Sequence, residues 1–303
     1  MKVVPRITPI RPLNKDEWAF LYGRMSKMKK HTIAFIGAGS ITEAIIEGMI
    51  KEKFIHANQI VVMNRSNLDR LEELKDKYNV QTTQNIEQLL KNNKVIILAM
   101  KPADAETALK NIQPYINESH LIISVLAGIT TSYVEEAIGT CTPIVRAMPN
   151  TSAMIGLSAT AISPGHFAQK EDLLFAENLF LTIGSVVQVT EDKMNAVTGL
   201  SGSGPAYFYY MVECMEKAAI QNGLDPDTAR ELLLQTMNGA ANMLRRTNQS
   251  PTLLREKITS SGGTTQAGIT SLKEYQFERA ILSCITDATK KAEELGKAFE
   301  KQK

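Results

Sequence analysis

The stretch TIAFIGAGSITEAIIEGM, residues 32–49, decides the fold. It begins with the apolar run Thr32 to Ile36, continues through Gly37-Ala38-Gly39, and then places apolar residues at helical spacing from Ile41 to Met49. These patterns predict a strand, a tight turn and a helix in direct succession. The free N–H groups and the dipole at the start of such a helix suit a pyrophosphate, so the stretch predicts the first unit of a dinucleotide-binding fold.

The match to the GxGxxG pattern is incomplete, because Thr42 stands at the sixth position. The last glycine of that pattern allows the helix to pack closely on the strand. We therefore expect Thr42 to push the helix away from the strand unless the packing here is looser. A Gly-x-Gly turn is often only a tight turn, so the rest of the chain is needed to show whether this turn binds a dinucleotide.

Further apolar runs predict further strands at Ile60 to Met63, Val95 to Met100, Leu121 to Val125, Ile144 to Ala147, Leu157 to Ile162 and Val186 to Val189. Helical segments lie between several of them, including 67–78 and 169–181. The continuous apolar runs are typical of strands that are covered on both sides. Strands alternating with helices predict a parallel, doubly wound sheet.

Beyond Glu191 the pattern changes to helix caps and periodic apolar stripes. The helix expected over 206–221 is apolar nearly all round and should be buried, while Asp225-Pro226 and Ser250-Pro251 are typical helix starts. We expect a second copy of the chain to complete this apolar core, which predicts a homodimer. The predicted fold class is an α/β N-terminal Rossmann-type nucleotide-binding domain, residues 30–190, plus an all-α C-terminal dimerisation domain, residues 191–303.

Composition excludes several classes of protein. Hydrophobic residues make up 44% and charged residues 22% of the 303, which is ordinary globular composition, and the net charge of +2 favours neither a nucleic-acid nor a membrane partner. Most of the basic excess lies in residues 1–29, which we interpret as a flexible basic extension, or as an upstream start with Met25 or Met28 as the true first residue. A targeting role is the remaining alternative for this segment.

The three cysteines are far apart and have no histidine beside them, so they predict neither a disulfide framework nor a metal site. None of the four histidines lies in a catalytic motif. A reducing compartment, and hence a cytoplasmic location, is the expectation.

The end of the second predicted strand bears on the choice of nucleotide. It reads Met63-Asn64-Arg65-Ser66 and lacks the carboxylate that NAD-specific enzymes place on the ribose 2′-hydroxyl. Arg65 instead suits a 2′-phosphate, which favours NADPH while leaving NADH possible. For Arg65, and for Lys101 after a later strand, the alternative is a solvated surface side chain.

The carboxyl ends of the predicted strands supply the expected cofactor-binding set apart from Asn85, which follows no predicted strand, since ligands bind at that edge in such folds. The set comprises Ile36, Gly37, Ala38, Gly39, Ser40, Ile41, Asn64, Arg65, Ser66, Asn85, Ala99, Met100, Lys101, Pro102, Ala127 and Gly128.

Two segments of the helical part contain hydroxyl groups and glycines: LSGSGPAY, residues 200–207, and TSSGGTTQAG, residues 259–268. The second leads into a helix whose first N–H groups could hold a carboxylate, although such a cluster alone is most often a cap and a loop. Together with the FIGAG turn, the AMKP and LAG strand ends and Met148-Pro149-Asn150-Thr151, they make residues 31–298 resemble the pyrroline-5-carboxylate reductases. The chain departs from that family at Thr42, where Gly or Ala is usual, and at Ser261, where Pro is usual.

The resemblance implies the NAD(P)H-dependent reduction of 1-pyrroline-5-carboxylate to L-proline, the last step of proline biosynthesis. It implies an intertwined homodimer, or a larger ring of such dimers, in which the turn of one copy meets the nucleotide domain of the other. The carried-over roles are a hydrogen bond from catalytic Thr265 to the imine nitrogen and a carboxylate site at Ser260, Gly263 and Thr264. A protonated cyclic imine is already electrophilic, so it needs a positioned hydride and no lysine or histidine acid.

Two other functions stay open from the sequence. One is a reductase of another small cyclic imine or of a keto acid, and the other is a non-catalytic paralogue that binds nucleotide. Hydroxy-acid dehydrogenation is disfavoured, because the related enzymes use a lysine near the segment that here reads GSGPAYFYYM, residues 202–211, and an alcohol proton would need such a base.

Overall fold

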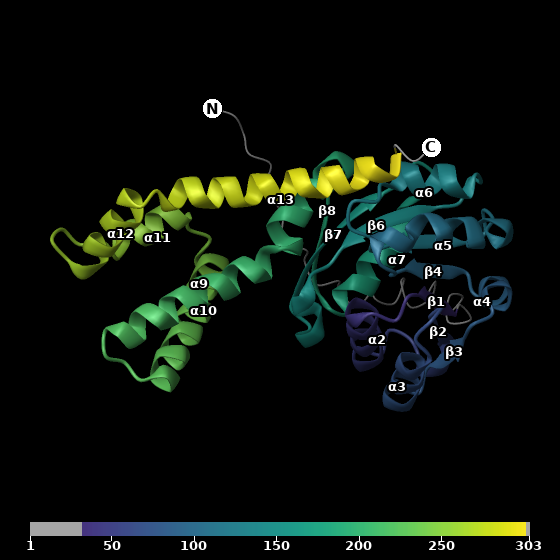
Figure 1. The fold of residues 1–303 in the computed structure, drawn as a ribbon, viewed down its shortest axis with the longest axis horizontal. Helices are drawn as coiled ribbons and strands as arrows, with labels where there is room; N and C mark the ends of the chain where they lie inside the picture. The colour runs from purple at the N-terminus through teal and green to yellow at the C-terminus, as the bar shows by residue number, and fades with distance from the viewer. Residues whose placement is uncertain (1–31, 301–303) are drawn as a thin grey trace.

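The computed structural model describes residues 32–300. It consists of a sheet flanked by helices and, extending from one side of it, an arm made of helices alone (Figure 1). The basic extension predicted for residues 1–29 lies outside the described residues.

One sheet forms the centre of the N-terminal half, with strand order β3-β2-β1-β4-β5-β6-β7-β8. The strands are β1 (Ile33–Ile36), β2 (Ile60–Met63), β3 (Gln81–Thr83), β4 (Val95–Leu98), β5 (Leu121–Ser124), β6 (Ile144–Met148), β7 (Ser158–Pro164) and β8 (Gly184–Gln188). The order reverses direction between β1 and β4, and a crevice for a ligand opens at such a point in doubly wound sheets.

All neighbouring strands are parallel except β6 and β7, which are antiparallel. The expectation of a parallel sheet is therefore wrong at this pair. Only the short turn of η4 (Thr151–Ile155) and a few residues join the two strands, whereas a parallel pair needs a crossover of a dozen residues or more. The sequence analysis also missed β3, because Gln81-Thr82-Thr83 is a polar edge strand without an apolar run.

Helices cover both faces of the sheet. One face packs against α2 (Ser40–Lys51), α3 (Leu68–Tyr78) and α7 (Lys170–Leu181), and the other against α4 (Ile86–Asn92), α5 (Ala105–Ile112) and α6 (Thr131–Ile138). Alternation along β1 explains this arrangement, since Ile33 and Phe35 join the first core cluster while Ala34 and Ile36 join the second. Both faces of β1 are thus buried, as its continuous apolar sequence predicts.

A buried charge interrupts the apolar interior of β6. The side chain of Arg146 is 1% exposed, and its Nη1 donates to Oε1 of Glu191 at 2.7 Å. Glu191 opens η5 (Glu191–Lys193), which begins the helical half. The same carboxylate oxygen accepts a hydrogen bond from the backbone N–H of Thr131 at 3.3 Å. Because a buried charge is costly unless it is paired, this contact ties the centre of the sheet to the first residue of the helical half.

Every described residue that forms secondary structure after β8 is helical, as the change of pattern at Glu191 predicts. The helices are α8 (Met194–Val197), the π-helical turn η6 (Thr198–Gly202), α9 (Gly204–Gln221), α10 (Pro226–Thr247), α11 (Pro251–Lys257), α12 (Thr264–Glu274) and α13 (Phe277–Glu300). The predicted caps are confirmed, since the side chains of Asp225 and Ser250 accept hydrogen bonds from the first turns of α10 and α11. In the described part of the chain, no helix is both long enough and apolar enough to cross a membrane.

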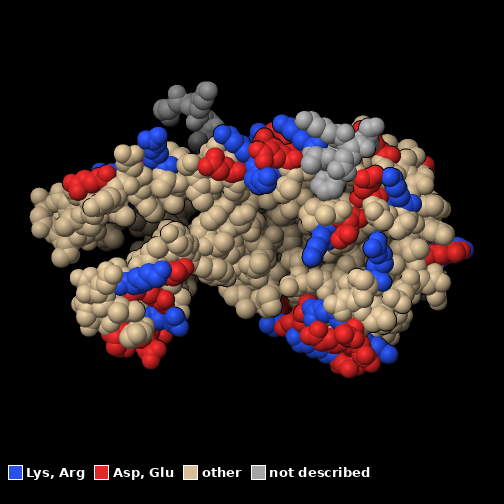
Figure 2. Space-filling model, viewed as in Figure 1, with Lys and Arg blue, Asp and Glu red and all other residues tan. Residues whose placement is uncertain are grey.

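The expectation that α9 is buried is wrong for a single copy of the chain. Phe208, Tyr209 and Tyr210 are 56%, 66% and 68% exposed. The arm that contains α9 and α10 extends away from the sheet (Figure 1), and its visible face carries both charged and uncharged side chains (Figure 2). No described residue of the same chain covers these rings, so none of residues 32–300 of this copy supplies their burial.

The last helix joins the arm to the sheet. Gly128, after β5, packs against α13 at Gly296, where a Cβ on residue 296 would lie 2.5 Å from the oxygen of Gly128. Gly199 approaches Thr289 of the same helix equally closely, with 2.6 Å between a Cβ added at residue 199 and Oγ1 of Thr289. Small residues therefore let α13 lie directly against both η6 and the end of β5.

Candidate active site

The structure brings the predicted cofactor-binding residues to one edge of the sheet. They follow the carboxyl ends of β1, β2, β3, β4 and β5, and these five strands are mutually parallel. The glycine turn lies at the centre of this edge, beside the reversal of strand order. The sequence analysis grouped these residues because parallel strands end on the same side.

Gly37 occupies a position that only glycine fits. Its φ is +117°, and a Cβ there would lie 2.4 Å from the carbonyl oxygen of Ala99. Its N–H donates to the oxygen of Met63 at 2.9 Å, so the turn lies between the ends of β2 and β4. Gly39 differs, since a Cβ at that residue would meet no atom within 4 Å. The side of the turn at Gly39 is therefore open to a ligand.

Thr42 fits beneath the turn, contrary to the expectation from the glycine pattern. The residue is completely buried, and its Oγ1 donates to the carbonyl oxygen of Gly37 at 3.0 Å. The methyl and hydroxyl groups thus lie against the strand end without separating α2 from β1. Sequence spacing could not show this, because the hydrogen bond depends on the direction of the Gly37 carbonyl.

The loop after β2 is shaped by Asn64. Its Oδ1 accepts hydrogen bonds from the backbone N–H groups of Ser66 at 3.1 Å and of Asn67 at 3.0 Å. Arg65 lies between Asn64 and Ser66 in the sequence. Its side chain is exposed at the sheet edge and is therefore accessible to a phosphate group.

Other members of the predicted set have structural roles that the sequence analysis did not assign. Asn85 caps α4, and its Oδ1 accepts from the N–H of Gln88 at 2.9 Å. Lys101 is exposed and precedes the short turn η2 (Pro102–Asp104). Gly128 is buried against α13, so position 128 requires a glycine at least partly because this helix packs against it.

A pocket of about 220 Å³ adjoins the glycine turn. It is lined by Ser40, Ile41, Ala44, Val125, Pro149, Asn150, Thr151, Ala153, Met154 and Gly202. Asn150 links the two halves there, since its Nδ2 donates to the oxygen of Ser201 at 3.0 Å. No lining side chain is titratable. The sequence analysis quoted Pro149, Asn150 and Thr151 without a role, although their place after a predicted strand was the signal that could have given them one.

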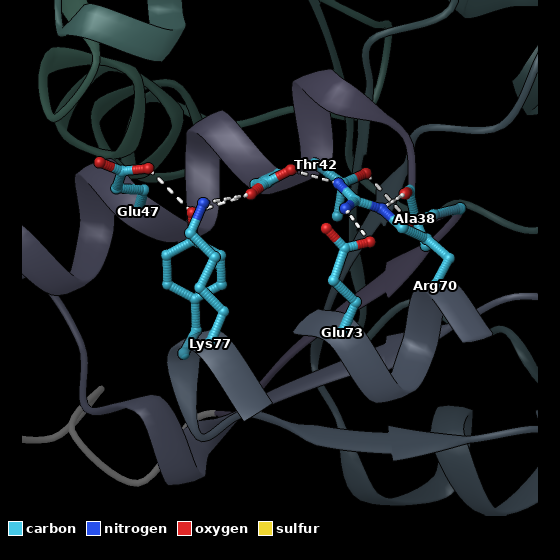
Figure 3. A network of polar contacts seen from close by, with 9 residues as sticks. Ala38, Thr42, Glu47, Arg70, Glu73 and Lys77 are labelled. Atoms are coloured by element: carbon cyan, nitrogen blue, oxygen red, sulfur yellow. Dashed lines mark hydrogen bonds and ion pairs between the residues drawn. The ribbon is translucent and has the colours of Figure 1, made fainter. Parts of the chain in front are cut away.

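A network of charged side chains holds α2 against α3 close to the turn (Figure 3). Glu43, in the first turn of α2, pairs with Arg70 and, at 2.8 Å, with Lys77. Tyr78 donates to Glu43 at 3.0 Å and to Glu47 at 2.8 Å. Figure 2 shows cationic and anionic side chains interleaved over these two helices at the lower edge of the molecule. Sequence reasoning missed this network, because it joins residues that are about thirty positions apart.

The network shifts two ionisation equilibria. The pKa of Glu43 is lowered to about 2, chiefly by its hydrogen bond to Lys77, with further contributions from Arg70 and Tyr78 outweighing the opposing effect of burial. Burial raises the pKa of Tyr78 to about 12. Glu43 is therefore ionised and Tyr78 neutral throughout the physiological range.

The predicted substrate residues form the turn before α12. Gly263 is the N-cap of that helix, and Gly262 has a φ of +74° that favours glycine. The N–H of Gly263 donates to the oxygen of Ser260 at 3.1 Å. Thr264 and half-buried Thr265 are the first residues of the helix, so the hydroxyls and the free N–H groups gather at one point.

One chain does not bring its substrate turn to its own nucleotide edge. Figure 1 places α12 at the end of the arm, beyond most of the length of α13 from the sheet. Thr265, on α12 in the arm, is thus far from the glycine turn in the sheet half, and a second copy would have to bring such a pair together.

Comparison with known proteins gives two family matches. Residues 191–295 match the model described as pyrroline-5-carboxylate reductase dimerisation, and residues 32–128 match that described as NADP oxidoreductase, coenzyme F420-dependent. The chain is 44% identical over 272 residues to pyrroline-5-carboxylate reductase 2 of Bacillus subtilis, covering 90% of this chain and 97% of the relative. The chain belongs to the pyrroline-5-carboxylate reductase family.

Solved structures of family members agree with the fold. The pyrroline-5-carboxylate reductase of Coxiella burnetii superposes with a TM-score of 0.81 at 36% identity, over 88% of this chain and 98% of that one. The Plasmodium falciparum enzyme, solved with NADP bound, has a TM-score of 0.81 at 27% identity over 88% and 99% of the two chains. The predicted family and the predicted fold class are confirmed.

The two glycines of the turn should respond differently to alanine. Gly39→Ala adds a methyl group only to the open side, so it should lower the free energy of unfolding by less than about 1 kcal/mol while weakening dinucleotide binding at least about tenfold. Gly37→Ala should destabilise the fold by about 3 kcal/mol or more, because it combines a positive φ with a backbone clash. Thermal unfolding and titration of cofactor fluorescence measure the two effects. A Gly39→Ala protein with wild-type affinity would contradict the placement of the pyrophosphate.

The stability contributed by Glu43 should depend on pH. Because folding lowers the pKa of this carboxyl from 4.5 to about 2, its stabilisation is fully present above about pH 5 and is lost as the pH falls toward 2. At pH 7, Glu43→Gln should be less stable than the wild type by about 2 kcal/mol, after allowance for the exposed position of Lys77.

Urea unfolding of both proteins between pH 7 and pH 3, at one protein concentration, tests this expectation. The difference in free energy of unfolding between Glu43→Gln and the wild type should become smaller as the pH falls. The matched change Glu73→Gln, at an exposed partner of Arg70, should show a much smaller gap. A gap for Glu43→Gln that does not change with pH would be inconsistent with an ionised, paired Glu43.

Proposed function

We propose that the chain reduces 1-pyrroline-5-carboxylate to L-proline, with NADPH as the preferred reductant. The observation that carries the proposal is the pocket beside the glycine turn. It is small, it adjoins Ser40 at the start of α2, and its lining offers hydroxyl and amide groups but no titratable side chain. That environment suits a substrate that needs a hydride at a carbon and no proton transfer from the pocket wall.

The electron balance of this reaction is simple. NADPH, when bound, supplies a hydride, which the imine carbon accepts as the C=N bond becomes a C–N bond. The nitrogen already carries its proton in the iminium form. The task of the chain is therefore to orient the ring and to hold its carboxylate.

The residues of the substrate turn suit that task. The hydroxyl of Thr265 can donate a hydrogen bond to the ring nitrogen as positive charge leaves it, and Ser260, Gly263 and Thr264 can bind the carboxylate through hydroxyl and N–H groups. The start of α12 adds a favourable dipole for an anion. These roles rest on the resemblance to the family together with the shape of the turn.

A homodimer would complete the site. The substrate turn lies far from the nucleotide edge of its own chain, and exposed Phe208, Tyr209 and Tyr210 offer a surface to a second copy. The family match over residues 191–295 is described as a dimerisation domain. We extend the proposal to a dimer, or the larger ring of dimers that the resemblance implies, in which each turn serves the partner's cofactor.

The domain division and the location also belong to this proposal. A boundary near residue 190 is supported by the end of β8 at Gln188 and by the start of the dimerisation match at residue 191. The widely separated, unpaired cysteines support a reducing compartment such as the cytoplasm.

The assigned role of Thr265 has a direct kinetic test. Thr265→Ala should lower kcat with 1-pyrroline-5-carboxylate about a hundredfold while changing the Kd for NADPH by less than about twofold, because the hydroxyl contacts the substrate and not the nucleotide. Thr270→Ala removes an exposed hydroxyl from the same helix and should retain wild-type rates. No turnover by a folded wild-type dimer would overturn the proposed reaction. An unchanged kcat in Thr265→Ala would overturn only the role of this residue.

Cofactor preference should depend on Arg65. Removing a charge-assisted contact to the 2′-phosphate by Arg65→Ala should weaken NADPH binding about ten- to a hundredfold and leave NADH binding within about twofold. Lys75→Ala removes an exposed cation from the last turn of α3 and controls for general loss of positive charge. Equal weakening of both nucleotides in Arg65→Ala would show that Arg65 does not bind the 2′-phosphate.

A further inference from the structure

We propose that Arg70 is a positioning residue for the nucleotide: its side chain holds the glycine turn, and its backbone belongs to the hydrogen-bonded loop that carries Arg65, so that the two phosphate-binding elements meet at one residue. The inference rests on the proposed function only in taking this edge of the sheet to bind a nicotinamide dinucleotide. Three sets of contacts support it.

The first contact fixes the glycine turn. Nε of Arg70 donates to the carbonyl oxygen of Ala38 at 3.0 Å, from a side chain on α3 to the backbone of the turn (Figure 3). In a trans peptide the carbonyl and the following N–H point in opposite directions. Holding the Ala38 oxygen toward α3 therefore directs the N–H of Gly39 away from α3, and a Cβ added at residue 39 would meet no atom within 4 Å, so the turn has room for a ligand there. That is the direction required of a donor to a pyrophosphate.

Thr42 acts on the preceding peptide in the same way. Its hydroxyl holds the carbonyl of Gly37, which orients the N–H of Ala38. Thr42, a residue of α2, and Arg70, a residue of α3, thus bind two successive carbonyl groups of the turn.

The second set of contacts leads to the loop after β2. The backbone N–H of Arg70 donates to Oδ1 of Asn67 at 2.9 Å, and the N–H of Asn67 in turn donates to Oδ1 of Asn64 at 3.0 Å. Asn64 also accepts from Ser66, so every residue flanking Arg65 belongs to this chain of hydrogen bonds. A displacement of the first turn of α3 would move Arg65 together with it.

The third set of contacts engages the two Nη atoms of Arg70 with carboxylates of the same chain. Its Nη2 pairs with Glu43, and its Nη1 pairs with Glu73 at 2.7 Å. With Nε on Ala38, all three nitrogens of the guanidinium have an acceptor. Arg65 is exposed and makes no such pair with the residues that the structure describes, so the two arginines have different roles: Arg65 contacts the nucleotide, and Arg70 orients the backbone around it. A lysine cannot replace this planar fork with a single ammonium group.

This division of roles predicts a pattern of affinities. The pyrophosphate is common to both nucleotides, so Arg70→Gln should weaken NADPH and NADH by the same factor, about tenfold, through the misplaced turn. The kcat at saturating NADPH should stay within about twofold of the wild type, because the substrate turn is untouched. Arg65→Ala should discriminate between the two nucleotides, whereas Arg70→Gln should not.

The experiment uses the full-length wild-type protein, Arg70→Gln, Arg70→Lys and Glu73→Gln. Glu73→Gln is the matched control, since it removes one partner of Arg70 but leaves the contacts to Ala38 and Glu43, and it should bind both nucleotides like the wild type. Fluorescence titration with NADPH and with NADH gives the Kd values, and thermal unfolding with sedimentation verifies fold and assembly. Where Arg70→Gln does not fold, Arg70→Lys serves in its place with the same equal weakening expected.

Equal weakening of both nucleotides with a preserved kcat supports the inference. Unchanged affinities in a folded Arg70 variant would overturn it and assign Arg70 to stability alone. A loss confined to NADPH would also overturn it, because Arg70 would then contact the 2′-phosphate itself. Failure of the wild type to bind either nucleotide would instead refute the proposed function.

Discussion

The position of Ala99 relative to Gly37 is the constraint on which the nucleotide edge depends. The carbonyl of Ala99 lies 2.4 Å from the place where a Cβ of residue 37 would be, so the first strand can turn into α2 only through a glycine with positive φ. This close approach lies where β1 and β4 are neighbours and where the strand order of the sheet reverses. The crevice, the open side at Gly39 and the pocket beneath Asn150 all follow from it.

A second constraint unites the two halves of the chain. Arg146 is a cation in the middle of an apolar strand, and Glu191, in the first turn of the helical half, forms an ion pair with its Nη1. Such a pair adds little net stability compared with an apolar pair of equal volume, but leaving either member alone is costly. The pair therefore acts mainly on position. It fixes the first residue of the helical half, Glu191, next to Arg146 in the sheet.

The local elements were largely predictable from the sequence because they depend on short-range patterns. The run Ile60–Met63 was found to the residue, and Asp225 and Ser250 marked their helices through side-chain caps. The direction of β7 was not predictable, since periodicity reports which faces are buried and not which way a strand runs. Strand β3 was missed for a different reason, because this edge strand is polar and contains no apolar run.

The two parts of the candidate site, the cofactor-binding edge and the substrate turn, were predictable to different degrees. Parallel strands end together, so the cofactor residues could be grouped from physical argument alone. The substrate turn was assigned by resemblance, because hydroxyls and glycines before a helix are common caps. The contacts of Arg70 and Thr42 with the turn lay beyond sequence reasoning, as they depend on carbonyl directions that only the folded backbone defines.

The crossing of α13 over the sheet has a mechanical consequence. This helix of 24 residues, about 36 Å long, starts beside the substrate turn and ends with Gly296 against Gly128 at the sheet edge. Bending it would break backbone hydrogen bonds, and its two glycine contacts leave no gap in which it could slide. The helix therefore resists movement of the arm relative to the sheet, because such a movement would have to break its backbone hydrogen bonds or separate its glycine contacts.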